Sequence, residues 1–364
     1  MTILLFLSGL FLLIVGAESL VRGSSRLAVS LGISPLTVGL TVVAFGTSSP
    51  ELAVSLKAAF SGQADIAVGN VVGSNILNVL LILGLSALIA PLSVSSRLIR
   101  LDVPLMILVS AAVLVFSVDG KFGRIDGAIL LANFLLYCWV LVRQGRRENG
   151  EIKEKYSRDL AGAGRGRIDT MKNIVLAAFG LGLLVVGSRL LVDGAVSFAK
   201  VFGVSESVIA LTVVAAGTSL PEIVTSVIAA IRGERDIAVG NVVGSNIFNI
   251  MAVLGLSGVA APRGLEVSAS MLRFDIPVMI SVALACLPLF FTGGKLSRKE
   301  GALLLGYYLA YTLYLVLASS HHDTLPVFSA AMLYFAIPIT AVTLTFYAAR
   351  EILAKSGEVR ARKN

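Results

Sequence analysis

The sequence predicts an all-α polytopic membrane protein, built from two inverted-topology repeats of five transmembrane helices plus an extra C-terminal helix. Composition is the first observation: 56% of the 364 residues are hydrophobic, only 14% are charged, and mean hydropathy is +0.90. A soluble domain of this size needs far more charged surface. The second observation is a series of apolar runs of roughly 20 residues, the length that crosses a hydrocarbon core of about 30 Å. The third is a long internal repeat.

The apolar runs divide the chain into about eleven predicted spans. In the first half they lie near residues 3–21, 36–60, 66–90, 101–118 and 125–142. In the second half they lie near residues 173–192, 207–231, 237–261, 274–292 and 299–318, and one more follows near 325–349. We therefore expect a first repeat at 1–142, a linker at 143–172, a second repeat at 173–318, and an extra helix with a basic tail at 319–364.

Basic residues predict the orientation of these spans, because cytoplasmic loops are enriched in Lys and Arg. With the N-terminus outside, 23 of the 30 basic residues fall on the inner side, and the C-terminus is cytoplasmic. The 143–172 stretch is rich in charge and glycine, which indicates a flexible cytoplasmic linker. We expect a multi-pass protein of the cell membrane. The net charge of +8 is spread over many loops, which argues against a nucleic-acid partner.

Cysteine and histidine usage argues against an enzyme or a soft-metal site. Cys138 and Cys286 lie in apolar spans and are too few for a disulfide framework or a metal cluster. The only histidines, His321 and His322, are adjacent in a predicted loop, and no His-Glu-x-x-His motif is present. We expect no cofactor.

The internal repeat is the most specific feature of the sequence. GTSSPE at 46–51 recurs as GTSLPE at 217–222, and DIAVGNVVGSNILN at 65–78 recurs as DIAVGNVVGSNIFN at 236–249, with thirteen of fourteen positions identical. RLDVPLM at 100–106 likewise matches RFDIPVM at 273–279. Five spans is an odd number, so each helix of the second half crosses the membrane opposite to its counterpart. Transporters with inverted repeats bind substrate near the midplane, where interrupted helices of the two halves meet.

Two prolines predict which helices are interrupted. Pro50 and Pro221 occupy the centres of their spans. Proline lacks an N–H group and clashes with the preceding turn, so the carbonyl groups four residues earlier, on Gly46 and Gly217, lose their helical partner. In a bilayer a freed carbonyl needs a partner from the protein, water or an ion.

Glu51 and Glu222 follow these prolines directly and lie near the centres of apolar spans. A carboxylate there costs roughly 2.5–3.5 kcal/mol on insertion scales. A structural ion pair is a poor explanation, because no Lys or Arg lies centrally in any predicted span; Lys57 is on the same helix as Glu51, nearer its outer end. We therefore interpret both glutamates as the centre of a cation site.

Helical spacing adds polar groups around each carboxylate. Thr47 and Ser48 share a helix face with Glu51, and Thr218 and Ser219 repeat the arrangement with Glu222. The next span of each half carries a polar stripe at four-residue spacing: Asn70, Ser74 and Asn78, then Asn241, Ser245 and Asn249. Taken singly, each is more often a hydrogen bond between helices. As a duplicated set with two carboxylates, they are hard oxygen ligands suited to Na⁺ and Ca²⁺.

The duplicated motifs, at 44–78 and 215–249, resemble the alpha-repeats of the calcium/cation antiporter superfamily, and within it the sodium/calcium exchangers of prokaryotic type. The resemblance implies ten core helices, alternating access, and overlapping sites for Na⁺ and Ca²⁺ in a lipid bilayer. By motif it implies these ligands: Glu51, Thr47, Ser48, Ser74 and Asn78 with Glu222, Thr218, Ser219, Ser245 and Asn249, and backbone carbonyl groups near Ala44 and Ala215. Some microbial members carry Asp where this chain has Asn249. Because this chain has Asn at both 78 and 249, its site has only two titratable groups, Glu51 and Glu222.

We therefore expect a secondary antiporter that exchanges Na⁺ for Ca²⁺ and extrudes Ca²⁺. A Ca²⁺/H⁺ antiporter and a K⁺-dependent Na⁺/Ca²⁺ exchanger stay open as alternatives, and a passive cation channel is a weaker one. Outside the site, the spacing of Glu18 and Arg22 indicates a structural ion pair, and Arg189 and Asp193 keep this spacing with the charges exchanged. The sequence indicates no oligomeric state.

Overall fold

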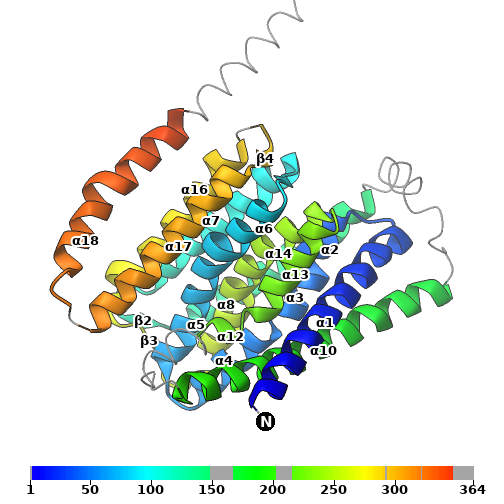
Figure 1. Ribbon diagram of the computed structural model, residues 1–364, viewed down its shortest axis with the longest axis horizontal. Coiled ribbons are helices and arrows are strands. Elements are labelled where there is room, and N and C mark those ends of the chain that lie inside the picture. Colours follow the sequence, from blue (N-terminus) through cyan, green and yellow to red (C-terminus); the bar gives the residue numbers. More distant parts are fainter. Residues whose placement is uncertain (1, 148–166, 202–214, 292, 321, 347–364) are drawn as a thin grey trace, which may run out of the picture.

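The computed structural model describes residues 2–147, 167–201, 215–291, 293–320 and 322–346, and these are almost entirely helical (Figure 1). Nine helices in the described part of the chain are long and apolar enough to span a membrane. Two shorter apolar helices, Pro35–Thr47 and Leu220–Ile231, belong to the spans predicted at 36–60 and 207–231. Residues 202–214 of the latter lie outside the described residues, as does 148–166 of the predicted linker. The all-α membrane fold is confirmed.

Each described helical element of the second repeat has a counterpart in the first. The first repeat contains α1 (Thr2–Leu31), α2 (Pro35–Val38), η1 (Gly39–Val43), α3 (Ala44–Thr47), α4 (Ser49–Phe60), α5 (Ala64–Leu77), η2 (Asn78–Leu83), α6 (Gly84–Ile89), η3 (Leu98–Asp102), α7 (Val103–Phe116) and α8 (Arg124–Arg147). The second contains α10 (Arg167–Val201), α12 (Ala215–Gly217), α13 (Leu220–Ile231), α14 (Arg235–Phe248), η5 (Asn249–Leu254), α15 (Gly255–Ala260), η6 (Met271–Asp275), α16 (Ile276–Phe291) and α17 (Arg298–Ser319). The η elements are π-helical turns within longer helices.

Two small strand pairs report the inverted symmetry. β1 (Leu92–Ser93) pairs with β4 (Lys295–Leu296), and β2 (Lys121–Phe122) pairs with β3 (Leu265–Glu266), both antiparallel. In the repeat, β1 corresponds to β3 and β2 to β4, so exchanging the halves converts one pair into the other. The pairs lie at opposite ends of the bundle (Figure 1), as a two-fold axis in the membrane plane requires.

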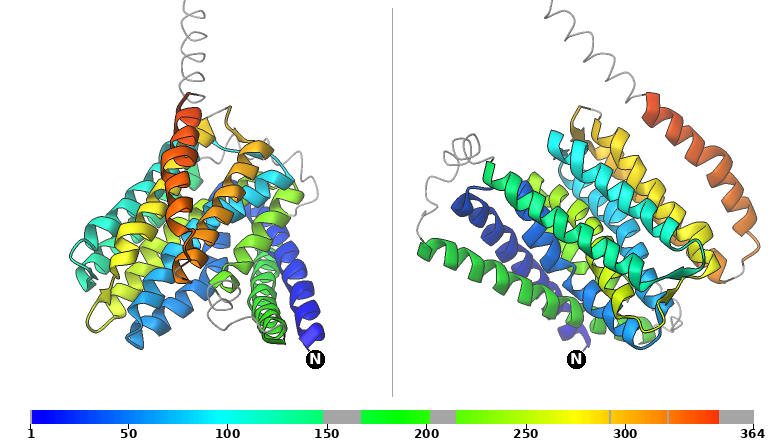
Figure 2. Two further views of the ribbon diagram at one scale, coloured as in Figure 1. Left: turned by 60° about the vertical axis from the view of Figure 1, so that its left-hand side comes forward. Right: turned by 180° about the vertical axis from the view of Figure 1, so that it is seen from behind.

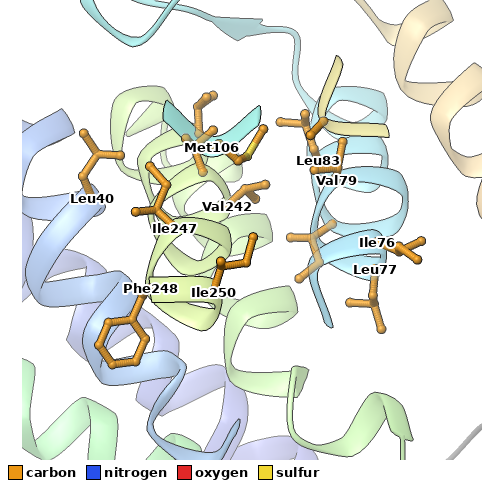
Figure 3. Packing of buried hydrophobic residues seen from close by; sticks show 14 of the residues in the cluster. Leu40, Ile76, Leu77, Val79, Leu83, Met106, Val242, Ile247, Phe248 and Ile250 are labelled. Atoms are coloured by element: carbon orange, nitrogen blue, oxygen red, sulfur yellow. The ribbon is translucent and has the colours of Figure 1, made fainter. Parts of the chain in front are cut away.

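The centre of the bundle is formed by the α5–α6 and α14–α15 helices. Every residue from Ile237 to Phe248 of α14 is buried. Figure 3 shows Val242 and Ile250 of this helix in the same apolar cluster as Ile76 and Val79 of its counterpart. These are the helices that carry the predicted polar stripes, so the site lies in the best-packed part of the molecule.

The first helices of the two repeats, α1 and α10, lie side by side at the edge of the bundle (Figures 1 and 2). Glycines allow their close approach: a Cβ atom on Gly16 would lie 2.8 Å from the carbonyl oxygen of Gly180, and one on Gly180 would lie 2.6 Å from that of Gly16. Small residues at such crossings let helix backbones approach closely in lipid.

An eleventh helix follows the two repeats, where the sequence predicted it. Its described part contains α18 (Leu325–Ala331) and η7 (Met332–Ala336) and continues as helix to residue 346. It diverges from the bundle beyond α17 (Figure 2), and its most apolar stretch has no buried residue. The hydroxyl group of Tyr307 on α17 donates to the carbonyl oxygen of Ala336 and to Oγ1 of Thr340, at 2.9 and 2.6 Å.

Candidate functional site

Both glutamates begin short helices directly after a break. α3 ends at Thr47 and α4 begins at Ser49, because Ser48 has a non-helical ψ of 7°. The second half is alike: Ser219, with a ψ of 6°, precedes α13. Proline in the first turn suits such a helix start, since no N–H donor is needed there. The prediction of interrupted helices is confirmed, and it places each glutamate in the first turn of the new helix.

The two breaks satisfy their carbonyl groups differently. The carbonyl oxygen of Gly217 accepts a hydrogen bond of 2.6 Å from Oγ of Ser188 on α10. The position that corresponds to Ser188 in the first repeat is Ala17, which has no hydroxyl group. The carbonyl oxygen of Ala44 accepts from the backbone N–H of Ser48 at 3.0 Å, and Oγ1 of Thr47 lies 3.5 Å from it.

The carboxylates of Glu51 and Glu222 are almost completely buried, with 0% and 1% exposure. Each accepts one hydrogen bond from the opposite half: Ser48 Oγ donates to Glu222 Oε1, and Ser219 Oγ donates to Glu51 Oε1, both at 2.8 Å. The second oxygen of each carboxylate, Oε2, is buried and has no hydrogen-bond partner among the described residues. Within the described residues, neither glutamate forms an ion pair with Lys or Arg.

The two threonines are connected to the polar stripes. Thr47 Oγ1 donates to Asn241 Oδ1 at 3.1 Å, and Thr218 Oγ1 donates to Asn70 Oδ1 at 3.4 Å. The amide nitrogens of these asparagines donate in turn to serine hydroxyl groups within their own halves, Asn70 to Ser55 and Asn241 to Ser226, each at 2.9 Å. The four bonds form two matching chains, each of which begins at a threonine of one half and ends at a serine of the other.

Asn78 and Asn249 lie at the first residue of a π-helical turn, in η2 and η5. Asn78 Nδ2 donates to Asn246 Oδ1 at 2.9 Å, and Asn249 Nδ2 donates to Asn75 Oδ1 at 3.3 Å. Oδ1 of Asn78 and Oδ1 of Asn249 are buried, and no described residue donates a hydrogen bond to either. Sequence reasoning did not single out Asn75 and Asn246. Both lie one position after the predicted serines, off the four-residue stripe, and only the crossing of α5 and α14 reveals their contacts.

In the described part of the chain, six buried oxygen atoms of the duplicated segments have no hydrogen-bond partner: Glu51 Oε2, Glu222 Oε2, Asn78 Oδ1, Asn249 Oδ1, Ser245 Oγ and Thr225 Oγ1. All of these residues except Thr225 were predicted as ligands from the motifs. Leaving a buried acceptor unpaired costs about 1–3 kcal/mol, and more for a charged one. Carboxylate, amide and hydroxyl oxygens together are a donor set for hard cations such as Na⁺ and Ca²⁺.

The remaining predicted residues are placed as follows. Ser74 is buried, and its Oγ lies 3.2 Å from Oγ of Ser219, the serine that donates to Glu51. Ala44 is fully buried. Ala215 begins α12, and its side chain lies outside the described residues. The Glu18–Arg22 ion pair is confirmed, whereas His321 of the predicted outer loop is not described.

Comparison with known proteins agrees with this geometry. A family model described as sodium/calcium exchanger protein matches residues 1–143 and 172–317. The putative antiporter CaxA of Alkalimonas amylolytica is 42% identical over 318 residues, which cover 86% of this chain and 98% of that protein. The sodium/calcium exchanger MaX1 of Methanosarcina acetivorans is 34% identical over 339 residues, and the match covers 85% of this chain and 96% of MaX1.

The fold also matches a solved exchanger. A structure of the sodium-calcium exchanger NCX_Mj superposes with a TM-score of 0.73 and 34% sequence identity, covering 88% of this chain and 99% of NCX_Mj. The residues that the family model matches include both glutamates. The chain belongs to the sodium/calcium exchanger family.

Proposed function

We propose that this antiporter extrudes Ca²⁺ from the cell in exchange for Na⁺, and that both ions bind in one central cluster around Glu51 and Glu222. The observation that carries the proposal is the pair of buried carboxylates, each with one oxygen held by a serine of the opposite half and one oxygen without a partner. A bound cation supplies the missing partner for the free oxygens and the counter-charge for both carboxylates.

The proposed ligands are the residues of the two motifs. Glu51 and Glu222 supply charge, and the other side chains supply neutral oxygen atoms: Thr47, Ser48, Ser74, Asn78, Thr218, Ser219, Ser245 and Asn249. The carbonyl groups of Ala44 and Ala215 complete the Na⁺ positions. With both carboxylates ionised the cluster carries a charge of −2. One Ca²⁺ or two Na⁺ neutralise it, and a third Na⁺ leaves it positive. Na⁺ and Ca²⁺ therefore compete for the same oxygens.

The solved structures of NCX_Mj support shared binding of these ions. That exchanger was soaked with Na⁺, Ca²⁺ and Sr²⁺ in different combinations, in work on extracellular ion exchange and binding-site occlusion. The duplicated motif of this chain contains only oxygen donors of the kind that such hard cations prefer.

We propose that the N-terminus lies outside the cell and the C-terminus inside, in the cell membrane. The distribution of 23 of the 30 basic residues on one side supports this orientation. Residues 1–142 and 173–318 form the two repeats, 143–172 is the cytoplasmic linker, and 319–364 carries the extra helix and the basic tail. The glycine-lined α1–α10 pair then moves across the core so that the cluster opens to each side in turn.

Ion fluxes in proteoliposomes test this function. ⁴⁵Ca²⁺ uptake is measured with an outward gradient of Na⁺, K⁺ or H⁺ imposed separately, and then with Na⁺ and K⁺ together. We expect the Na⁺ gradient alone to drive uptake, and external Na⁺ to compete with external Ca²⁺. Uptake driven only by a pH gradient would replace the proposal with Ca²⁺/H⁺ exchange, and an absolute need for K⁺ beside Na⁺ would make the exchanger K⁺-dependent. Uptake without any counter-ion would indicate a channel.

A further inference from the structure

We propose that Asn75 and Asn246 are positioning residues for the cation site: each fixes the amide orientation of an asparagine in the opposite half. Asn246 holds Asn78, and Asn75 holds Asn249, so that both ligand amides direct Oδ1 toward the cation and Nδ2 away from it. The inference rests on the cation site proposed above and concerns residues outside its ligand set.

The positioning asparagines are themselves fixed across the two-fold axis. Asn75 Nδ2 donates to the backbone carbonyl oxygen of Asn246 at 3.3 Å, and Asn246 Nδ2 donates to that of Asn75 at 3.4 Å. Their amide nitrogens also contact the sulfur atoms of Met279 and Met106, at 3.7 and 3.4 Å. Both nitrogens are therefore used, and each Oδ1 is available only as an acceptor. All four asparagines of this cluster are at least 98% buried.

This arrangement leaves one favourable orientation for each ligand amide. The oxygen and nitrogen ends of an asparagine side chain have nearly the same shape, so packing alone does not select between them. If the amide of Asn78 were rotated by half a turn, its oxygen would face Asn246 Oδ1 across 2.9 Å, and two acceptors would repel each other. Its N–H₂ group would then face the cation, where a donor repels positive charge. Asn246 prevents both.

A carboxylate at the ligand position has no such requirement. Aspartate presents an acceptor oxygen in either orientation and has no N–H₂ group to direct away. Because this chain has Asn at both 78 and 249, each ligand position depends on its acceptor in the other half. Asn246 and Asn75 thus hold Asn78 and Asn249 in the orientation that presents an oxygen to the cation. A carboxylate presents an oxygen in either orientation and needs no such partner.

A double-mutant cycle tests the pairing. Asn246→Leu removes the acceptor at similar volume, Asn78→Asp removes the need for it, and the two are combined. The equilibrium Kd for ⁴⁵Ca²⁺ is measured on the purified full-length protein in detergent. We expect Asn246→Leu to weaken binding about tenfold in the natural background, as loss of an interaction worth 1.4 kcal/mol requires. In the Asn78→Asp background an aspartate oxygen faces Asn246 Oδ1, so the same change removes a repulsion between two acceptors, and we expect it not to weaken binding.

A crossed cycle is the matched control. Asn246→Leu combined with Asn249→Asp should show additive effects, because Asn246 bonds Asn78 and not Asn249. The mirror cycle, Asn75→Leu with Asn249→Asp, should repeat the coupling of the first. It keeps the test valid if Asn246→Leu does not fold, and Asn246→Ala provides a smaller change for the same purpose. Size-exclusion profiles identify variants that do not fold.

The outcomes separate this inference from the function on which it rests. Equal losses in the natural and the Asn78→Asp backgrounds, or equal coupling in the crossed and direct cycles, would overturn the positioning role and leave a packing role for Asn246. Unchanged Ca²⁺ binding in Glu51→Gln and Glu222→Gln would overturn the cation site itself. Coupling confined to the direct and mirror cycles supports the proposal, since a packing defect does not depend on the charge of one ligand.

Discussion

The two repeats are nearly identical at the centre of the molecule and clearly different at its edge. Around the glutamates, the bonds to the carboxylates have counterparts in the two halves, Ser48 to Glu222 and Ser219 to Glu51. The threonine–asparagine chains and the asparagine pairs are matched in the same way. At the edge, Glu18 on α1 accepts from both Arg22 and Arg232, with Arg232 Nε at 2.9 Å, and Ser25 Oγ donates to Glu234 at 2.6 Å. These bonds tie α1 to the turn that follows α13.

The corresponding edge of the second repeat has no such tie. The residues that match Glu18 and Arg22 are Arg189 and Asp193, which form no ion pair within the described part of the chain. The turn that they would face after α4 carries Ser61 and Gln63 where the other turn carries Arg232 and Glu234. An inverted repeat changes access by exchanging the conformations of its halves. Contacts present in one half only therefore favour one of the two states.

The largest expected effect tests the symmetry of the centre. Glu51→Gln and Glu222→Gln each keep the side-chain shape and remove one negative charge. We expect either change to abolish or nearly abolish Ca²⁺ exchange, because a divalent ion in a low-dielectric site depends most on carboxylate charge. Insertion and folding should be retained, since removal of a buried charge lowers the insertion cost.

The measurement is ⁴⁵Ca²⁺ flux in proteoliposomes at matched protein amounts, with size-exclusion profiles as the control for folding. The two variants should lose flux to the same degree. Near-normal flux in either one would remove that glutamate from the site, and a large difference between them would show that the centre is less symmetric in function than in geometry.

At the two amide ligands we expect effects that are smaller than those of the glutamine variants and equal to each other. Asn78→Ala and Asn249→Ala each remove one unpartnered oxygen and no charge. We expect each to weaken apparent Ca²⁺ affinity about tenfold, the effect of an interaction worth 1.4 kcal/mol. The KM for Ca²⁺ in Na⁺-driven uptake measures this. Losses as severe as those of the glutamine variants would contradict the ranking of charge above neutral ligands.

Sequence reasoning found the parts of the molecule that depend on composition and local spacing. The apolar runs predicted the spans, and the duplicated motif predicted the inversion. Glu51 and Glu222 were recognisable because a carboxylate in an apolar helix is costly unless it has a function. The prolines beside them predicted the breaks, because the loss of a backbone donor is a local property.

The missed contacts all depend on which faces of distant helices meet. Asn75 and Asn246 belong to the repeated segment, but their role follows from the crossing of α5 and α14. The bond from Ser188 to the Gly217 carbonyl depends on how α10 lies against α12. Glu18 was predicted to pair with Arg22 at helical spacing, and its second partner, Arg232, is 214 residues away in the chain. No periodicity reports such a contact.

A modest, one-sided effect is expected at the edge. Arg232→Gln removes the bond between α1 and the turn after α13. In the proposed orientation this turn is cytoplasmic, so the bond favours the state that is open to the outside. The side chains of Arg232 and Glu18 are partly exposed, and such ion pairs contribute about 0.2–1 kcal/mol of interaction free energy. We therefore expect apparent affinity for external Ca²⁺ to fall by about fivefold at most.

The matched control is Arg189→Gln, at a position without an ion pair in the described residues, where we expect no change. Both variants are compared in right-side-out vesicles by the KM for external Ca²⁺, and the charge-reversed pair Glu18→Arg with Arg232→Glu should restore the natural value. Equal shifts in Arg189→Gln and Arg232→Gln would show that the charge of the region matters and the α1 contact does not.

The smallest effect is expected outside the repeats, at the eleventh helix. The family model matches residues 1–143 and 172–317 and ends before this helix. The stretch Leu325–Phe346 has no buried residue in its most apolar part, and Tyr307 on α17 forms hydrogen bonds with it. Truncation after Ser319 should therefore leave the KM for Ca²⁺ and the Na⁺ dependence unchanged, measured by the same flux assay in proteoliposomes. Tyr307→Phe is the matched control, since it removes the bonds and keeps the helix. A truncated protein that folds by size exclusion but loses coupled exchange would mean that the helix acts on the core through α17.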